Sequence, residues 1–215
     1  MAEKFEKCCK FKIELKGTKA TRTVVFPVDI TLFMLHQIIQ QIFGWRECHL
    51  WHFRDARRNF YGFGEDPFGR LIDCGVDYVK TPDEVRLDSL LKVKGDKMVY
   101  EYDFGDGWEH VITRMGDVKE RSFECLKTTG PDGEENCGGC WGLNALKRPP
   151  ADLADINNRM EFLVLTIKET SKSMSYLDEY NKKKSEKKVK KAAQKKDRKT
   201  PKKSVQRGAK NKTAN

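Results

Sequence analysis

The sequence lacks a long apolar run, and it lacks an apolar segment near its first residue. A membrane-spanning helix needs about 18 or more consecutive apolar residues, and the 215 residues contain no such run. A secretory signal needs an apolar stretch close to its start, whereas residues 1–7 read MAEKFEK. We therefore expect a cytoplasmic protein that does not cross a membrane, with a nuclear location if its source is eukaryotic.

Aromatic residues are absent after Tyr180, where lysine becomes dominant. Residues 181–215 contain 16 basic and 2 acidic residues, whereas residues 1–180 contain 26 basic and 30 acidic ones. The net charge of the whole chain is +10, so its basic character belongs to the last segment. That segment has too little apolar area to fold alone. We expect one domain over residues 1–180, with a core at about residues 10–170, followed by a disordered tail.

The lysine-rich tail is suited to bind polyanions. Clustered lysines displace counterions from a nucleic-acid backbone without reading its sequence, and a segment without aromatic residues cannot stack on bases. We therefore expect nonspecific, salt-sensitive binding of nucleic acid, with a merely solubilising tail as the alternative. The lysines concerned are Lys182, Lys183, Lys184, Lys187, Lys188, Lys190, Lys191, Lys195 and Lys196.

The first part of the domain reads as a hairpin followed by a helix. Residues 11–15 alternate apolar and charged side chains, and residues 23–28 are rich in β-branched ones, as expected of two paired strands. Residues 32–43 then place apolar side chains at helical spacing. Thr31 is a suitable N-cap for this helix, and Gly44 is a suitable residue to end it.

The second part adds strands and a helical region. A third strand is predicted at residues 49–54, and a closing hairpin at residues 97–104 and 108–114. Residues 116–142 read as a glycine-containing loop, and residues 153–167 return to helical spacing. Hairpin, helix, strand and closing hairpin are the order of a β-grasp, so we predict an α+β fold: a mixed sheet with one main helix across it, plus a C-terminal helical region.

Residues 100–110 (YEYDFGDGWEH) gather polar groups at a tight turn between two strands. In the structural interpretation, aspartate and glycine supply the backbone angles and hydrogen bonds of the turn, and the tryptophan packs. In the functional interpretation, carboxylates and imidazoles from the turn and the third strand form a pocket for a divalent metal ion or for acid–base chemistry. The candidates for this ligand pocket are His49, His52, Asp103, Asp106, Trp108 and His110.

The seven cysteines of the chain are expected to be core residues or metal ligands, because thiols stay reduced inside cells. Cys137 and Cys140 form a C-x-x-C pair, which is typical of zinc knuckles and of redox pairs. With Cys125 they make three candidate ligands for a possible zinc ion, and His110 is a candidate fourth. A redox role would need a thioredoxin-like context, which is missing. A glycine turn with ordinary thiols is the third interpretation.

The motif at residues 100–110 resembles the signature of the plasmid Ri ORF-three-like family. Its members are sometimes labelled TnpR-like passenger proteins of insertion elements, which are mobile elements. The resemblance covers about residues 10–170 and excludes the tail. It implies an intracellular, mostly bacterial α+β domain, without implying a mechanism. Other matching pieces are Leu35-His36, residues 43–45 (FGW), 48–53 (CHLWHF), 137–139 (CGG) and 141–142 (WG).

The TnpR label suggests a resolvase, which the residues do not support. A serine recombinase needs a nucleophilic serine near the start of a doubly wound domain, and the first serine of this chain is Ser89. We therefore expect a non-catalytic interaction module that recognises a protein or small ligand at the turn and binds nucleic acid through the tail. The alternative is a metal-dependent enzyme, such as a hydrolase of a nucleotide or phosphodiester, that uses the Asp and His residues.

Overall fold

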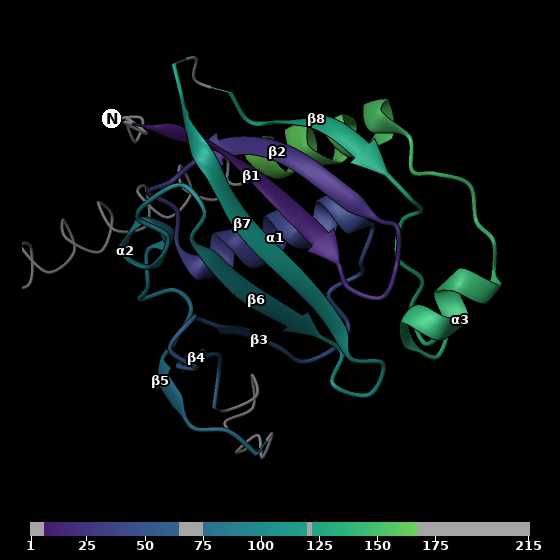
Figure 1. Cartoon of the computed structure of the whole chain (residues 1–215), viewed down its shortest axis with the longest axis horizontal. Helices are drawn as coiled ribbons and strands as arrows, with labels where there is room; N and C mark the ends of the chain where they lie inside the picture. Colours follow the sequence, from purple (N-terminus) through teal and green to yellow (C-terminus); the bar gives the residue numbers. More distant parts are fainter. Residues whose placement is uncertain (1–6, 65–74, 120–121, 167–215) are drawn as a thin grey trace, which may run out of the picture. The chain divides into compact units, whose positions relative to one another are not determined.

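An eight-stranded mixed sheet forms the centre of the computed structural model (Figure 1). The structure describes residues 7–64, 75–119 and 122–166. The strands are β1 (Cys8–Leu15), β2 (Thr21–Pro27), β3 (Trp51–Arg54), β4 (Phe60–Tyr61), β5 (Tyr78–Lys80), β6 (Lys97–Tyr102), β7 (Trp108–Val118) and β8 (Glu124–Thr129). Their order in the sheet is β5-β4-β3-β6-β7-β1-β2-β8. Only β4 and β5 are paired in parallel; the other neighbouring pairs are antiparallel.

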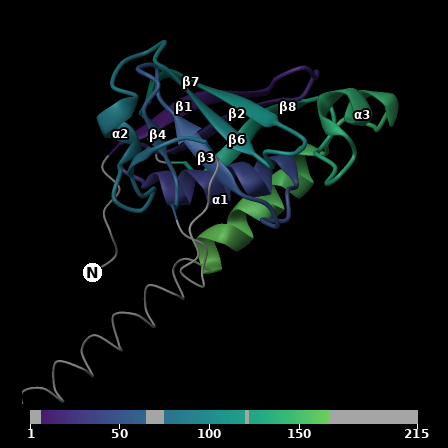
Figure 2. The same ribbon diagram turned by 90° about the horizontal axis from the view of Figure 1, so that it is seen from below.

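Helices accompany the sheet mainly on one side. The labelled helices are α1 (Leu32–Phe43), α2 (Leu87–Leu90) and α3 (Gly139–Ala145), and residues 153–166 form another. Figure 2 shows α1 and the helix of residues 153–166 on the same face of the sheet. In the described part of the chain, no helix is both long and apolar enough to span a bilayer.

Helix α1 begins and ends where the sequence predicts. The Thr31 side chain accepts a hydrogen bond from the backbone N–H of Met34 at 3.2 Å, which satisfies one of the free donors of the first turn. Gly44 ends the helix in the left-handed conformation, with φ of 72°. Eight positions of α1 are buried, among them Leu35 and Ile38, so the predicted apolar stripe is the buried face.

The core lies between α1 and the inner face of the sheet. Phe11, Ile13 and Leu15 alternate along β1 and are each at most 1% exposed. The ring of Phe11 stacks on that of Phe26 in β2, with the centroids 4.5 Å apart. Fully burying a side chain of this size stabilises the fold by about 1.5–3 kcal/mol. This row of side chains fixes the register of the first hairpin, since a shift of one residue would turn it to the outer face.

The predicted α+β architecture is confirmed, as are the first hairpin and α1. The C-terminal helical region is confirmed for residues 153–166, whereas residues 167–180 and the tail of residues 181–215, with its nine lysines, lie outside the described residues. The predicted loop at residues 116–142 is wrong, because it contains β8 and α3. Only Cys125 is buried in β8, so this edge strand has no alternating pattern to reveal it. The finer β-grasp assignment stays a prediction.

Candidate metal centre

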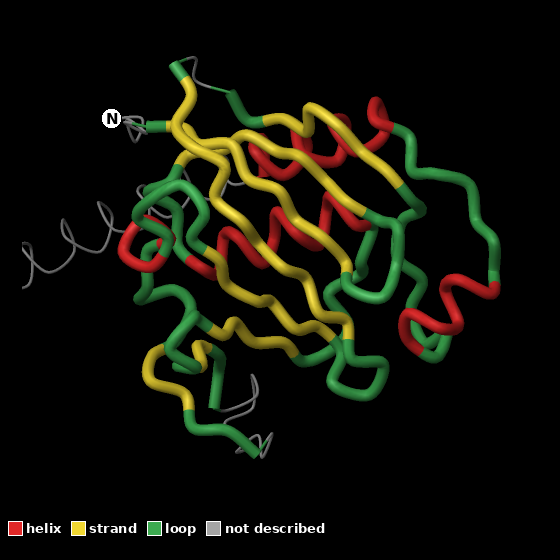
Figure 3. The backbone as a smooth tube through the Cα atoms, viewed as in Figure 1, coloured by secondary structure: helices red, strands yellow, loops and turns green. Residues whose placement is uncertain are grey.

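Five polar side chains from three chain segments meet beside the turn between β6 and β7. One segment joins α1 to β3, the second includes the end of β6 and the turn itself, and the third joins β8 to α3. Figure 3 shows these green loops gathered at one end of the sheet. We call the five residues the His49 cluster: Cys48, His49, Tyr102, Asp103 and Glu135.

His49 lies between two carboxylates. Its Nε2 atom is 3.4 Å from Oδ2 of Asp103 and 3.4 Å from Oε2 of Glu135. The Glu135 side chain is only 8% exposed. Nε2 of His49 and Oε2 of Glu135 are both buried, and neither has a hydrogen-bond partner among the described residues. Buried polar atoms without a partner are rare and need an explanation, such as an ion that the protein binds.

In each carboxylate of the cluster, the oxygen that does not contact His49 accepts hydrogen bonds from the protein. Oε1 of Glu135 accepts hydrogen bonds from the backbone N–H of Arg46 at 2.9 Å and from the hydroxyl of Tyr102 at 3.0 Å. Oδ1 of Asp103 accepts them from the N–H groups of Gly105 at 3.0 Å and Asp106 at 3.4 Å. These bonds leave one oxygen of each carboxylate directed at His49. Outer hydrogen bonds of this kind orient the ligands of metal sites.

Cys48 adds a thiol on the solvent side of the cluster. One ligand atom each from Cys48, His49 and Glu135 lies within 4.8 Å of the others, and Cys48 is exposed. The hydroxyl of Tyr102 accepts a hydrogen bond from the Cys48 backbone N–H at 3.1 Å and lies 3.6 Å from its sulfur. Burial raises the pKa of Tyr102, so its hydroxyl keeps the proton that it donates to Glu135.

The spacing of these atoms suits one transition-metal ion. Two ligands that are each about 2.1 Å from a tetrahedral ion lie about 3.4 Å apart. Nε2 of His49 and Oε2 of Glu135 are separated by 3.4 Å. A thiolate, an imidazole and a carboxylate together are a donor set that zinc accepts. Oδ2 of Asp103 lies 3.4 Å from the same histidine nitrogen, although Asp103 is not among the residues whose ligand atoms all lie within 4.8 Å of one another.

Glycine at position 133 lets the third segment pack against Trp45. A Cβ atom on Gly133 would lie 2.2 Å from Cη2 of the Trp45 ring, which is too close for any side chain. The N–H of Gly133 also donates to the carbonyl oxygen of Phe43, the last residue of α1, at 2.8 Å. The segment is thereby fixed two residues before Glu135, and this close packing positions the Glu135 carboxylate.

A buried ion pair anchors the same segment. Arg22 is 0% exposed, and its guanidinium donates to Oδ1 of Asp132 at 2.9 Å and to the carbonyl oxygen of Ile42 at 2.7 Å. Asp132 also accepts a hydrogen bond from Arg159 at 2.9 Å through its other oxygen. Burial lowers the pKa of Arg22, and the Asp132 carboxylate opposes that shift. The segment that carries Glu135 is therefore joined to β2, to the end of α1 and to the C-terminal helix.

Comparison with known proteins identifies the family. Residues 7–162 match the family model of the plasmid pRiA4b ORF-3-like protein. The chain belongs to the plasmid pRiA4b ORF-3-like family. The resemblance inferred from the sequence motifs is confirmed, and the match includes every residue of the His49 cluster.

One sequence relative and one solved structure are similar to this pRiA4b ORF-3-like protein. It is 36% identical over 142 residues to the uncharacterized protein y4hQ of Sinorhizobium fredii (strain NBRC 101917 / NGR234). That match spans 62% of this chain and 66% of the relative, slightly under two thirds of its length. The crystal structure of MM3350, a protein of unknown function from Methanosarcina mazei Go1, is similar with a TM-score of 0.53 and 24% identity. It covers 66% of this chain and 80% of that chain, and the likeness concerns the fold alone.

His110 and Trp108 belong to the core of this pRiA4b ORF-3-like protein. His110 is 0% exposed, and its Nε2 accepts a hydrogen bond from the indole N–H of Trp45 at 3.1 Å. Its Nδ1 lies 3.1 Å from the carbonyl oxygen of Trp108. Both ring nitrogens are therefore occupied by the protein. Trp108 is 1% exposed and packs on Trp45, with the ring centroids 4.9 Å apart, so both residues lie in the core.

The side chains of His52 and Asp106 make contacts with other residues than those of the His49 cluster. Nε2 of His52 is 3.2 Å from Oε2 of Glu101, and the histidine pairing is the main cause of the lowered pKa of Glu101. Oδ2 of Asp106 accepts a hydrogen bond from the N–H of Gly138 at 3.2 Å, which ties the turn to the start of α3. Of the predicted pocket residues, the structure brings together His49 and Asp103.

The three predicted zinc cysteines lie in β8, just before α3 and within α3. Cys125 is buried in β8, where its backbone N–H donates to the Asn157 side chain at 2.8 Å. Cys137 precedes α3, and Cys140 lies within it, beside Gly17 of the first hairpin. Burial raises the pKa values of Cys125 and Cys137, which keeps both as thiols. Within the described ranges, the group with metal-ligand spacing is instead Cys48, His49 and Glu135.

Sequence reasoning missed three residues of the cluster. Cys48 stands beside His49 in a segment that the family resemblance already includes, and this adjacency was the available signal. Tyr102 lies in the motif at residues 100–110, where its spacing is that of a buried strand position. Glu135 gives no local signal, because it joins the cluster only through the packing of its segment against Trp45.

Proposed function

We propose that the His49 cluster binds one divalent transition-metal ion of the zinc type, and that the protein is a metal-binding module. The observation that carries this proposal is the meeting of two buried atoms without hydrogen-bond partners, Nε2 of His49 and Oε2 of Glu135, beside the Cys48 thiol. An ion between them would satisfy both atoms at once. Oε1 of Glu135 and Oδ1 of Asp103 accept hydrogen bonds from the protein. These bonds orient the other oxygen of each carboxylate as a ligand.

The module is proposed to use the ion for interaction. Cys48 is exposed, so one side of the ion faces solvent and offers a position for a small ligand or for a side chain of a protein partner. This keeps the polar turn as the recognition site, with His49 and Asp103 as its members. If Asp103 also ligates, the site is closed and the ion joins three loops as a structural centre.

A metal-dependent hydrolase is the second candidate function. Three protein ligands and an open position are the usual arrangement of catalytic zinc, where a bound water becomes a nucleophile near neutral pH. The substrate class is a nucleotide or a phosphodiester. Zinc-loaded protein should then hydrolyse an activated phosphodiester, and the variant Glu135→Gln should not. Stoichiometric metal without any turnover would favour the interaction module.

Metal content tests the proposal directly. We expect protein purified without chelator to contain about one equivalent of zinc, and metal-free protein to rebind zinc or cobalt. Glu135→Gln and His49→Ala should each weaken binding at least about 100-fold. Glu134→Gln is the matched control, because Glu134 is the adjacent carboxylate but pairs with Arg148 outside the cluster. Added zinc should raise the melting temperature of the wild type and of Glu134→Gln alone.

Two results would overturn the proposal. One is a wild-type protein that neither contains nor rebinds a divalent ion. The other is equal zinc affinity in Glu135→Gln and Glu134→Gln. In either case the cluster would be a histidine held between two carboxylates by charge, and the interaction module would have to recognise its ligand without a metal.

We also propose further features of the protein. The 16 basic residues of residues 181–215 favour a tail that binds nucleic acid nonspecifically. The order β6-β7-β1-β2 with α1 across it favours the β-grasp description. Neither of these proposals depends on the metal.

A further inference from the structure

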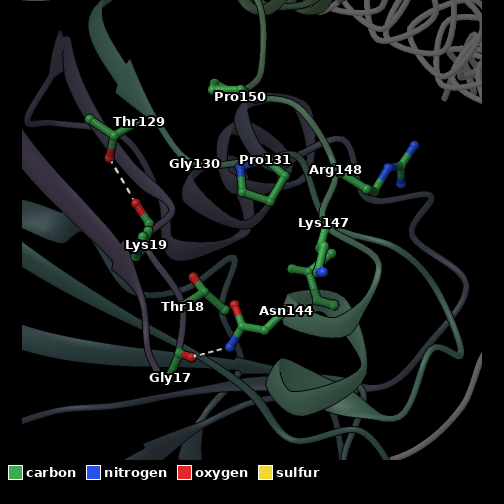
Figure 4. Close-up of a pocket in the computed structure, with 11 residues that line it drawn as sticks. Gly17, Thr18, Lys19, Thr129, Gly130, Pro131, Asn144, Lys147, Arg148 and Pro150 are labelled. Atoms are coloured by element: carbon green, nitrogen blue, oxygen red, sulfur yellow. Dashed lines mark hydrogen bonds between the residues drawn. The ribbon is translucent and has the colours of Figure 1, made fainter.

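A cavity lies between the turn that follows β1 and the segment that follows α3 (Figure 4). Its volume is about 730 Å³, within the range of pockets that hold small organic molecules. In the close-up, Lys19 and Thr129 lie on one side of the cavity, and Asn144 and Lys147 lie on the other. The cavity is distinct from the His49 cluster, since none of the five cluster residues lines it.

The charge of this cavity differs from that of the surrounding domain. Lys19, Lys147 and Arg148 line it, and no aspartate or glutamate does. Arg148 is paired with Glu134, whereas Lys19 and Lys147 have no carboxylate partner among the described residues. Residues 1–180 carry 26 basic and 30 acidic residues. A lining with basic but no acidic residues therefore differs from the average composition of this part of the chain. Cations from two distant chain segments, on a lining without carboxylates, create a positive potential that favours an anion.

The walls of the cavity are held in place by hydrogen bonds. Asn144 of α3 donates to the carbonyl oxygen of Gly17 at 2.8 Å, and Thr129 donates to that of Lys19 at 2.8 Å (Figure 4). The N–H of Ala151 donates to the carbonyl oxygen of Gly130 at 2.9 Å. The backbone at the two lysines is therefore already ordered, and an anion that binds there does not have to order it first.

The uncharged residues of the lining indicate which chemical group the anionic ligand carries besides its charge. Pro131, Leu143 and Pro150 supply apolar wall, and the volume exceeds what a single phosphate needs. The lining offers no aromatic ring for base stacking and no His, Cys, Asp or Glu for a metal ion. We propose that this cavity binds a small organic phosphate monoester, with the phosphoryl group between Lys19 and Lys147 and the organic part against the prolines.

Amide chemical shifts in the full-length protein test this site separately from the lysine-rich tail. We would titrate ¹⁵N-labelled protein with ribose 5-phosphate, with inorganic phosphate and with ribose. Ribose 5-phosphate should shift the amides of Gly17, Lys19 and Gly130 saturably, inorganic phosphate should shift them with weaker affinity, and ribose should not shift them. This ranking separates an organic monoester from free phosphate as the preferred ligand.

Charge-removing variants complete the test. Lys19→Gln with Lys147→Gln should weaken ribose 5-phosphate binding at least about 10-fold. The matched control is Lys92→Gln with Lys94→Gln, two exposed lysines in the segment before β6, and it should bind as the wild type does. The proposal fails if the shifts are confined to residues 181–215, if both double variants bind equally, or if inorganic phosphate binds more tightly than the monoester. Zinc binding should be unchanged in both double variants, so a failure here leaves the His49 cluster untouched.

Discussion

The indole N–H of Trp45 donates a hydrogen bond to Nε2 of His110 over 3.1 Å in the core of the domain. Because Nε2 accepts this bond, the ring proton lies on Nδ1, which can donate to the carbonyl oxygen of Trp108. Burial lowers the pKa of His110 to about 3, and the nearby Arg22 acts in the same direction. His110 is thus a neutral core residue, and through Trp45 it supports the segment that carries Glu135.

The first prediction is a loss of stability in mild acid. His110 and His36 both have pKa values lowered to about 3 by burial, against about 6.5 in an unfolded chain. Between these values the unfolded state binds more protons, so the free energy of unfolding falls as pH falls from 6.5 toward 3. Each histidine should lower the free energy of unfolding by roughly 2 kcal/mol at pH 5 relative to neutral pH.

Urea denaturation at several pH values between 7.5 and 5 would measure this effect. His110→Gln should be less stable than the wild type at pH 7.5, yet its stability should fall less steeply toward pH 5. His36→Gln, which removes one of the two partners of the Tyr100 hydroxyl, the other being Gln40, should behave in the same way. Wild-type slopes in both variants would show that these histidines do not titrate on unfolding.

The second prediction concerns the packing of the Glu135 segment. Gly133→Ala places a methyl group against the Trp45 ring, where a Cβ atom would be 2.2 Å from the nearest carbon. Overpacking of this kind lowers the free energy of unfolding by about 1–3 kcal/mol. It should also weaken zinc binding, because the shifted segment carries Glu135. Gly64→Ala is the control, since a Cβ there meets no described atom within 4 Å; a similar loss in both variants would contradict the packing argument.

The third prediction tests the buried ion pair. Asp132→Asn leaves the fully buried guanidinium of Arg22 without its carboxylate, and losses of about 3–5 kcal/mol are typical of such changes. Glu14→Gln is the comparison, because Glu14 pairs with Lys12 at 2.8 Å where both side chains are about 40% exposed. That surface pair should contribute at most about 1 kcal/mol. Thermal and urea denaturation would compare the two, and equal effects would show that the carbonyl groups around Arg22 suffice.

The sequence predicts the parts of this fold that depend on local patterns. Helix α1 has both its caps and its apolar stripe within residues 31–44, and the first hairpin alternates clearly. Edge strand β8 buries only Cys125, so no periodicity indicates it. The site divides in the same way. His49 and Asp103 belong to recognisable motifs, whereas Glu135 reaches them only through Gly133, Trp45 and the Arg22–Asp132 pair, which are long-range contacts.

The fourth prediction separates the two proposed sets of zinc ligands. Cys48→Ser should lower zinc affinity and abolish the sulfur-to-metal charge-transfer absorption of the cobalt-substituted protein. Cys137→Ser should leave both unchanged, because Cys137 lies outside the group with metal-ligand spacing. The reverse result would assign the ion to the cysteines near α3. The intensity of the cobalt d–d bands reports the coordination number of the bound ion.

The last prediction concerns residues 181–215. If the 16 basic residues there bind a nucleic-acid backbone, the logarithm of the binding constant for duplex DNA should fall linearly with the logarithm of salt concentration, by about 0.9 for each phosphate contacted. Replacing the nine lysines between positions 182 and 196 by glutamine keeps the length of the chain and should flatten this slope. Truncation after Tyr180 should abolish the salt-dependent binding, because residues 1–180 carry more acidic than basic residues. Fluorescence anisotropy with an unrelated second duplex would check that affinity does not depend on sequence. Undiminished affinity in the truncated protein would place the nucleic-acid site on the folded domain.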